Sequence, residues 1–287
     1  MKIIDLKEVL FHITNVCNLS CLNCENYSDR NFKGHYFWKD HEDLYYKWAE
    51  KLKVRRITLI GGEPFANPKL LEWVEETRKC FKSTTEFMIC TNGTYIEKNI
   101  DLTTQIIKNG FKLDISLHDP AFRKSIEDGM AKVADNLNAT KVCASDEYVS
   151  YELNGRSIMT LVNQTMFWKN STKEIKNKII FFHRSDPVKA HSLCIAACGG
   201  QGYYLLKGKL YKCYFTAIGS DLTSQFNIEH EGAQLLNSYV PADPFDEEEK
   251  LNSFFEQLPN HIKQCTLCTE THSVAPIWPM PKGKTQL

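Results

Sequence analysis

Apolar and polar positions along the first two-thirds of the chain predict repeated strand–helix units. Short apolar runs predict strands over Glu8–Thr14, Arg55–Ile60, Thr85–Cys90, Lys112–Leu117 and Lys178–His183. Helical spacing and end signals predict helices over Glu42–Leu52, from Asn67-Pro68 to about Phe81, over Asp101–Asn109 and within Ala121–Asn136. This alternation is typical of parallel strands joined by helical crossovers, so we expect an α/β fold.

Two hairpins and a late helix interrupt this alternation. Residues 147–161 form the first predicted hairpin around Asn154-Gly155, which favours a type I′ turn. Tyr203–Leu206 and Lys209–Tyr211 flank a second turn. A helix is predicted over Glu247–Leu258 because its large apolar side chains share one face.

Three cysteines stand directly after the first predicted strand. Cys17, Cys21 and Cys24 are spaced C-x3-C-x2-C. Three thiolates on one short loop can hold three irons of a [4Fe–4S] cube and leave the fourth iron open to a small molecule. The alternative is zinc, which usually takes four ligands, often as two C-x2-C pairs. The spacing therefore favours an iron–sulfur cluster with an open iron.

A second motif follows the strand that ends at Ile60, with the sequence Gly-Gly-Glu-Pro. Paired glycines at a strand end allow a close backbone approach to a ligand, because no Cβ intervenes. Together with the cysteine loop, this motif resembles the radical S-adenosylmethionine (SAM) enzymes. In that family the open iron binds SAM, and the third cysteine usually follows an aromatic residue, where this chain has Asn23. The family residues matched here are Gly61, Gly62, Glu63 and Pro64.

The resemblance implies a fold, cofactors and a chemistry. The family fold is a partial (β/α)6 barrel, with the active site at the carboxyl ends of its strands. The cofactors would be SAM and a [4Fe–4S] cluster, whose electron cleaves SAM to a 5′-deoxyadenosyl radical that abstracts hydrogen from a substrate. We therefore expect a radical SAM oxidoreductase or maturase, with an electron donor such as flavodoxin or ferredoxin.

Other candidate residues lie at the ends of the third and fourth predicted strands. Asn92 belongs to a Thr-Asn-Gly run of a kind that recurs in the family. Ser116 and His118 share the polar face of one strand with Asp114, and the resemblance suggests that Ser116 lies near the ribose of SAM. His118 and Cys90 are candidate catalytic residues, but the strand period does not fix which way Cys90 points. The alternatives are structural roles for both side chains.

The last third carries a second set of cysteines, Cys194, Cys198, Cys213, Cys265 and Cys268. This set, with its hairpin and helix, resembles the auxiliary-cluster domains called SPASM and Twitch. Five cysteines fit one auxiliary [4Fe–4S] cluster of the Twitch type, and the spacing leaves open which four bind. A four-thiolate zinc ribbon is the alternative. The resulting prediction is a radical SAM barrel over residues 1–190 and a small auxiliary-cluster domain over 191–287.

Composition and charge fit this assignment and weaken others. The 287 residues carry 35 basic and 35 acidic side chains, so nucleic acid is an unlikely partner on charge grounds. No apolar run is long enough for a membrane span, and no signal peptide follows Met1, so we expect a cytoplasmic protein. Eleven cysteines, an odd number, favour metal ligands over disulfides in that compartment.

Several hypotheses on function stay open at this point. The substrate would be a peptide or protein residue or a small metabolite. The barrel begins near Glu8, which disfavours an enzyme with its own leader-peptide recognition extension. One alternative is a non-catalytic zinc- or iron-binding interaction protein, and another is a radical SAM enzyme that modifies RNA.

Overall fold

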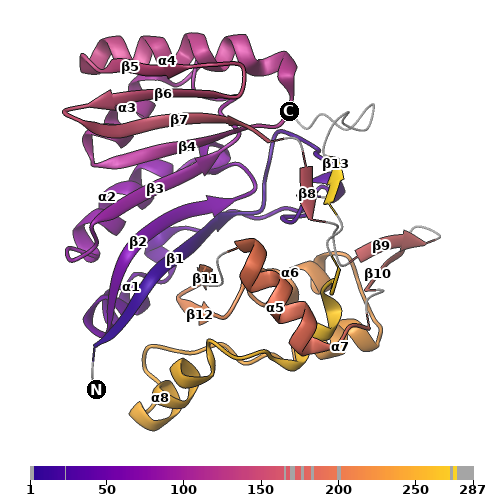
Figure 1. Ribbon diagram of the computed structural model, residues 1–287. Coiled ribbons are helices and arrows are strands. Elements are labelled where there is room, and N and C mark those ends of the chain that lie inside the picture. Colours follow the sequence, from indigo (N-terminus) through magenta and orange to yellow (C-terminus); the bar gives the residue numbers. More distant parts are fainter. Residues whose placement is uncertain are drawn as a thin grey trace.

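The structure, a computed structural model, describes residues 3–22, 24–164, 166–168, 172–175, 178–181, 184–198, 202–271 and 274–276. Its main feature is a nine-stranded sheet in the order β12-β11-β1-β2-β3-β4-β7-β6-β5 (Figure 1). The strands from β11 to β7 in this order are parallel to their neighbours. The sheet strands are β1 (Ile4–Thr14), β2 (Leu52–Gly61), β3 (Glu86–Thr91), β4 (Phe111–Leu117), β5 (Thr140–Ala144), β6 (Tyr148–Leu153), β7 (Arg156–Asn163), β11 (Gly202–Leu206) and β12 (Lys209–Tyr211).

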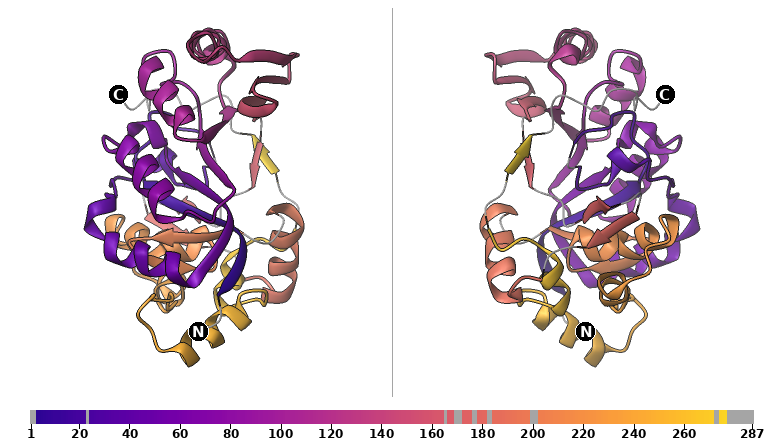
Figure 2. Two further views of the ribbon diagram at one scale, coloured as in Figure 1. Left: turned by 90° about the vertical axis from the view of Figure 1, so that its left-hand side faces the viewer. Right: turned by 90° about the vertical axis from the view of Figure 1, so that its right-hand side faces the viewer.

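Helices link the parallel strands and cover one face of the sheet, as the side views in Figure 2 show. These crossover helices are α1 (Glu42–Lys51), α2 (Leu70–Cys80), α3 (Ile100–Lys108) and α4 (Arg123–Leu137). The later helices are α5 (Pro187–Cys198), α6 (Tyr214–Gln225), α7 (Glu231–Asn237) and α8 (Glu248–Gln257). Two small sheets pair β8 (Met166–Trp168) with β13 (Val274–Pro276) and β9 (Thr172–Ile175) with β10 (Lys178–Phe181).

Aromatic side chains fill the space between β1 and the first two helices. The Phe11 ring lies 5.8 Å from the Tyr45 ring and 6.1 Å from the Trp73 ring, and Trp38 lies 4.5 Å from Tyr45. All four of these side chains are buried. Aromatic pairs at these separations add to the stabilisation from buried apolar area. The core therefore fixes β1 firmly, and β1 leads into the cysteine loop.

The structure confirms most of the predicted elements. Asn154 and Gly155 both have positive φ, 52° and 72°, as a type I′ turn between β6 and β7 requires. The helix predicted from Asn67-Pro68 begins at Leu70, because the Asn67 side chain accepts a hydrogen bond from the Lys69 N–H at 2.9 Å before the helix starts.

Two strands lie where the sequence pattern did not place them. The predicted strand Lys178–His183 is β10 as far as Phe181, and it pairs with β9 outside the main sheet; residues 182 and 183 lie outside the described residues. The sixth parallel strand is instead β11, whose residue Tyr203 pairs with Val9 of β1. The second hairpin thus extends the main sheet, and the boundary at residues 190 and 191 stays a prediction.

Candidate functional site

A cavity of about 230 Å³ opens at the carboxyl ends of β1, β2, β3 and β4. It brings together nearly all the candidate residues of the first two-thirds of the chain. The candidates that line it are Cys17, Cys21, Cys24, Gly61, Gly62, Cys90, Asn92, Ser116 and His118. Active sites of parallel α/β folds lie at this end of the strands, so the position fits the sequence prediction.

The three cysteines of the loop are buried together with Leu19. The Leu19 N–H donates to the Cys17 Sγ at 3.4 Å, and the Asn92 amide Nδ2 lies 3.8 Å from the same sulfur. Burial, then the nearby Glu63 carboxyl, raises the pKa of the Cys17 thiol to about 12, and burial also raises the pKa of Cys21. A thiolate that is shielded from water needs a neighbouring positive charge to stabilise its negative charge, and metal ions supply such a charge.

The donor set is three buried thiols with N–H groups directed at the Cys17 sulfur, a kind of ligand set that iron–sulfur clusters use. Among the described residues, no group of three or more His, Cys, Asp or Glu side chains could hold one ion. A cube of four irons holds its thiolates further apart than a single ion does. The N–H groups directed at the Cys17 sulfur are contacts that tune such clusters. Cys17, Cys21 and Cys24 are therefore the thiols of this cavity that could serve as cluster ligands.

The paired glycines allow another segment of backbone to approach closely, and that segment is mainly the end of β1 and the start of the cysteine loop. A Cβ on Gly61 would lie 2.1 Å from the Thr14 carbonyl oxygen, and one on Gly62 would lie 2.3 Å from that of Val16. The backbone N–H of Gly62 donates to the Thr14 oxygen at 2.8 Å. The glycines therefore dock the end of β2 against the start of the cysteine loop, besides lining the cavity.

The Glu63 side chain connects the ends of β2 and β3 and does not line the cavity. Its Oε1 accepts from the Thr91 hydroxyl at 2.7 Å and from the Phe65 N–H at 3.0 Å. Its Oε2 accepts from the Asn92 N–H at 2.7 Å. Burial raises the pKa of Glu63 to about 7. Pro64 is buried at the start of a short 3-10 helix, Pro64–Ala66, so both side chains position the loop.

The polar face of β4 is directed as predicted. Leu113, Ile115 and Leu117 are buried on one face, while Ser116 and His118 line the cavity. Burial lowers the pKa of His118 to about 4. Cys90, whose direction the strand period left open, also lines the cavity.

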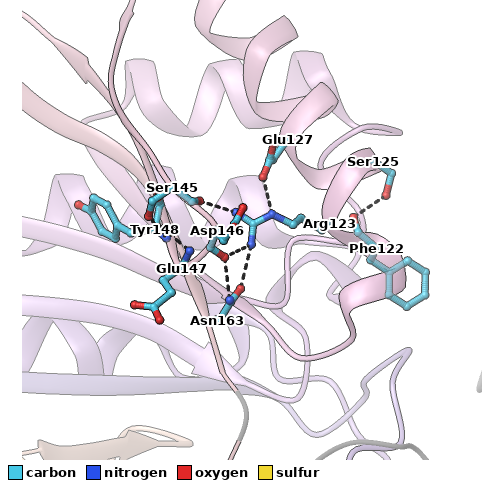
Figure 3. A network of polar contacts seen from close by, with 9 residues as sticks. All are labelled: Phe122, Arg123, Ser125, Glu127, Ser145, Asp146, Glu147, Tyr148 and Asn163. Atoms are coloured by element: carbon cyan, nitrogen blue, oxygen red, sulfur yellow. Dashed lines mark hydrogen bonds and ion pairs between the residues drawn. The ribbon is translucent and has the colours of Figure 1, made fainter.

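An aromatic side chain from the start of α4 covers the cysteine loop. Phe122 packs against the buried cluster of the three cysteines and Leu19. The next residue, Arg123, is held in a network of polar contacts (Figure 3). Its guanidinium donates to the Ser145 carbonyl at 2.8 Å and to the Asp146 carbonyl, and it pairs with the Glu127 carboxylate at 2.7 Å. This network fixes the segment that carries Phe122.

The second cysteine set gathers where α5, the start of α6 and the 3-10 helix Lys263–Leu267 meet. Burial raises the pKa of Cys213 and Cys265, and each also responds to the charge of Cys194. Cys268 follows the 3-10 helix and acts electrostatically on Tyr214, the residue after Cys213. Cys198 is the last residue of α5, and its side chain lies outside the described residues. The chain thus brings distant cysteines to one region.

Sequence reasoning did not name several residues that line the cavity, among them Glu25, Tyr204 and Tyr214. Glu25 follows the third cysteine, and burial raises its pKa to about 7. Tyr204 lies on β11, and its ring is 6.1 Å from that of Tyr214. The strand alternation of the second hairpin would have indicated Tyr204 only if that hairpin had been placed beside β1.

Comparison with known proteins identifies the domain that contains the first site. Residues 11–146 match the family model described as the radical SAM superfamily. The match places a radical SAM domain over these residues, and this superfamily combines a [4Fe–4S] cluster with SAM for radical chemistry. Within the described residues, no helix has the length and apolar character that membrane crossing requires.

Individual relatives are distant. A probable GTP 3′,8-cyclase of Methanocaldococcus jannaschii is 22% identical over 122 residues, which are 42% of this chain and 40% of the relative. The chain therefore spans less than half the length of that curated relative. The structure of BtrN in complex with AdoMet and 2-DOIA has a TM-score of 0.49 and 15% identity, covering 93% of both chains. SuiB of Streptococcus suis bound to S-adenosylmethionine has a TM-score of 0.34 and 12% identity, covering 86% of this chain and 65% of SuiB.

Proposed function

We propose that the radical SAM domain binds a [4Fe–4S] cluster through Cys17, Cys21 and Cys24, binds SAM beside it, and removes a hydrogen atom from a substrate in the same cavity. One observation carries this proposal. The three buried thiols share a single cavity with both motif glycines and with polar side chains from β3 and β4. One cavity therefore offers the ligands for a cluster, exposed backbone that a small molecule can contact, and space for a substrate.

When bound, the cluster supplies the electron that cleaves SAM to a 5′-deoxyadenosyl radical. The chain supplies position and shielding. The Leu19 N–H and the Asn92 amide orient the Cys17 thiolate, while Glu63 fixes Asn92 through its backbone N–H. Phe122 covers the cysteine loop and restricts water there. Gly61, Gly62, Asn92 and Ser116 are the proposed contacts of SAM, with Glu63 and Pro64 acting through the loop backbone.

The second cysteine set is proposed to hold one auxiliary [4Fe–4S] cluster in a Twitch-like domain over residues 191–287. Cys213 is the central ligand, because it interacts with Cys194 and lies near Cys265. The fourth ligand of this cluster would be either Cys268 or Cys198. Such a cluster would take an electron from the substrate radical or help to bind the substrate. A maturase or oxidoreductase acting on a peptide residue or a small metabolite would use it in this way.

The remaining assignments follow from this chemistry. A low-potential electron donor of the flavodoxin or ferredoxin kind would reduce the clusters. The cysteine ligands must stay reduced, which favours the cytoplasm. His118 and Cys90 line the cavity and are the candidate side chains for proton or hydrogen transfer.

Anaerobic reconstitution tests the proposal. The wild type should bind roughly eight irons per chain, as two cubes require, and form 5′-deoxyadenosine from SAM only with a reductant. Replacing Cys17, Cys21 and Cys24 by alanine should halve the iron and abolish 5′-deoxyadenosine. Cys143→Ser is the matched control, since this exposed cysteine lies on β5, away from both sets. Zinc in place of iron, or iron without SAM cleavage, would reject the proposal.

A further inference from the structure

One carboxylate in the cavity meets no hydrogen-bonding or ion-pair partner among the residues that the structure describes. Glu25 directly follows the third cysteine and lines the cavity. Among the described residues, no hydrogen bond or ion pair reaches its carboxylate, and its electrostatic contact is with the Tyr214 phenol. Buried carboxylates in proteins are normally paired or hydrogen-bonded, because an unpaired buried charge is costly. The Glu25 carboxylate, half-buried at the cavity wall, is therefore available to a polar group of a bound molecule.

The described lining of the cavity contains no lysine and no arginine that could offset this charge. Two tyrosine rings lie there instead. Tyr204 and Tyr214 line the cavity with their rings 6.1 Å apart and inclined at 55°. Aromatic faces attract cations, and the attraction grows when the cation is removed from water. A carboxylate that interacts with Tyr214, in a cavity that the neighbouring Tyr204 also lines, is therefore a site for a positive charge and a poor site for an anion.

We propose that the substrate of this enzyme carries a protonated amine, and that Glu25, Tyr204 and Tyr214 bind it. This inference deepens the proposed function and rests on it. The carboxylate accepts hydrogen bonds from the ammonium group, and the two rings cover its remaining surface. A phosphate or carboxylate group at the same place would meet Glu25 without a compensating cation and would be repelled. The substrate class is thus an amine, either an amino metabolite or a peptide with an amino group.

The three residues come from three different elements of the fold, and each element holds its side chain in place. Glu25 is fixed by the cysteine loop, Tyr204 by β11 and Tyr214 by the start of α6. Cys213 precedes Tyr214, so the amine site lies between the two cysteine sets. A substrate held there by its amine would lie within the cavity that the first set lines and near the second set.

A minimal probe tests the site without knowledge of the full substrate. The SAM-loaded, anaerobically reconstituted enzyme is titrated at pH 8 with ethylammonium chloride, and binding is followed as the saturable rise in unfolding temperature. Ethanol and propionate are the neutral and anionic probes of matched size, with ionic strength held constant by sodium chloride. We expect ethylammonium to stabilise the wild type saturably, and the other two probes to give no saturable effect.

Variants then assign the effect to the three side chains. Glu25→Gln should weaken ethylammonium binding at least tenfold, and Tyr214→Leu should weaken it while Tyr214→Phe, which keeps the ring, retains it. Equal ethylammonium binding by the wild type and Glu25→Gln, no saturable binding by the wild type, or stronger binding of propionate would overturn the inference. So would a Glu25→Gln variant that binds SAM itself more weakly by the same factor, because Glu25 would then serve the sulfonium. Iron content and 5′-deoxyadenosine formation are measured in parallel, so that a failure of the proposed function is recognised separately.

Discussion

Replacing Glu63 by glutamine should loosen the end of β3 from the Gly-Gly-Glu-Pro loop. A glutamine Oε1 can still accept from the Thr91 hydroxyl and the Phe65 N–H, whose present distances to Glu63 Oε1 are 2.7 and 3.0 Å. Its NH₂ group would instead face the Asn92 N–H, which now donates to Oε2 at 2.7 Å. Glu63→Gln thus removes one charge-assisted hydrogen bond and leaves one buried donor without an acceptor.

The expected loss follows from these contacts. A hydrogen bond to a charged group contributes about 1.5–3 kcal/mol, and an unsatisfied buried donor costs about 1–3 kcal/mol. Relief of the desolvation of a buried carboxylate offsets part of the loss. We expect the free energy of unfolding to fall by about 2 kcal/mol for Glu63→Gln, and by about 4 kcal/mol for Glu63→Ala, which loses all three acceptor contacts.

Urea unfolding followed by circular dichroism measures the change, and hydrogen exchange of the Asn92 amide locates it. Glu75→Gln is the matched control, because Glu75 is exposed on α2, and its effect should stay within about 0.5 kcal/mol. An unfolding free energy of Glu63→Gln within about 0.5 kcal/mol of the wild type, with unchanged protection of the Asn92 amide, would show that the Glu63 carboxylate does not hold this strand end.

Three further predictions concern the same end of the sheet. Gly62→Ala should prevent stable folding or iron uptake, because its Cβ would lie 2.3 Å from the Val16 oxygen; normal iron content in this variant would contradict the account. Burial lowers the pKa of His12 to about 4, so the unfolded chain binds this proton at a higher pH than the folded chain does. His12 by itself should therefore lower the free energy of unfolding by about 3 kcal/mol between pH 6.5 and 4, in addition to the contributions of other buried groups such as His118. Over this range the unfolding free energy of His12→Gln should fall by about 3 kcal/mol less than that of the wild type, whereas His261→Gln, at an exposed position, should follow the wild type. Arg123→Met should release the Ser145 and Asp146 carbonyls and increase proteolysis of the β5–β6 turn, and unchanged cleavage there would contradict the role of the network.

The parallel strands were predictable because their apolar runs and the helices between them are local patterns. Asn154-Gly155 likewise specifies its turn through backbone conformations that few residues adopt. The pairing of β11 with β1 joins residues nearly two hundred positions apart, as in Val9 and Tyr203, and no local pattern encodes it. For that reason the second hairpin was not expected to extend the main sheet.

In the candidate site too, local patterns predicted some residues, whereas the roles of others depend on contacts between distant parts of the chain. Spacing alone indicated Cys17, Cys21 and Cys24, and alternation indicated Ser116 and His118, which the structure brings into one cavity. Glu63 was expected beside SAM, yet its carboxylate connects backbone and side-chain donors of two strand ends, a role that depends on tertiary contacts.

We propose that the loop cysteines hold a cluster with one open iron that SAM can bind. Electron paramagnetic resonance of the reduced enzyme, recorded with and without SAM, tests this most directly. A variant with Cys213, Cys265 and Cys268 replaced by alanine removes the signal of the auxiliary cluster. If SAM binds the open iron, it should change the g-values of the remaining cluster. A [4Fe–4S] spectrum that SAM leaves unchanged, or a spectrum without any such cluster, would contradict this proposal.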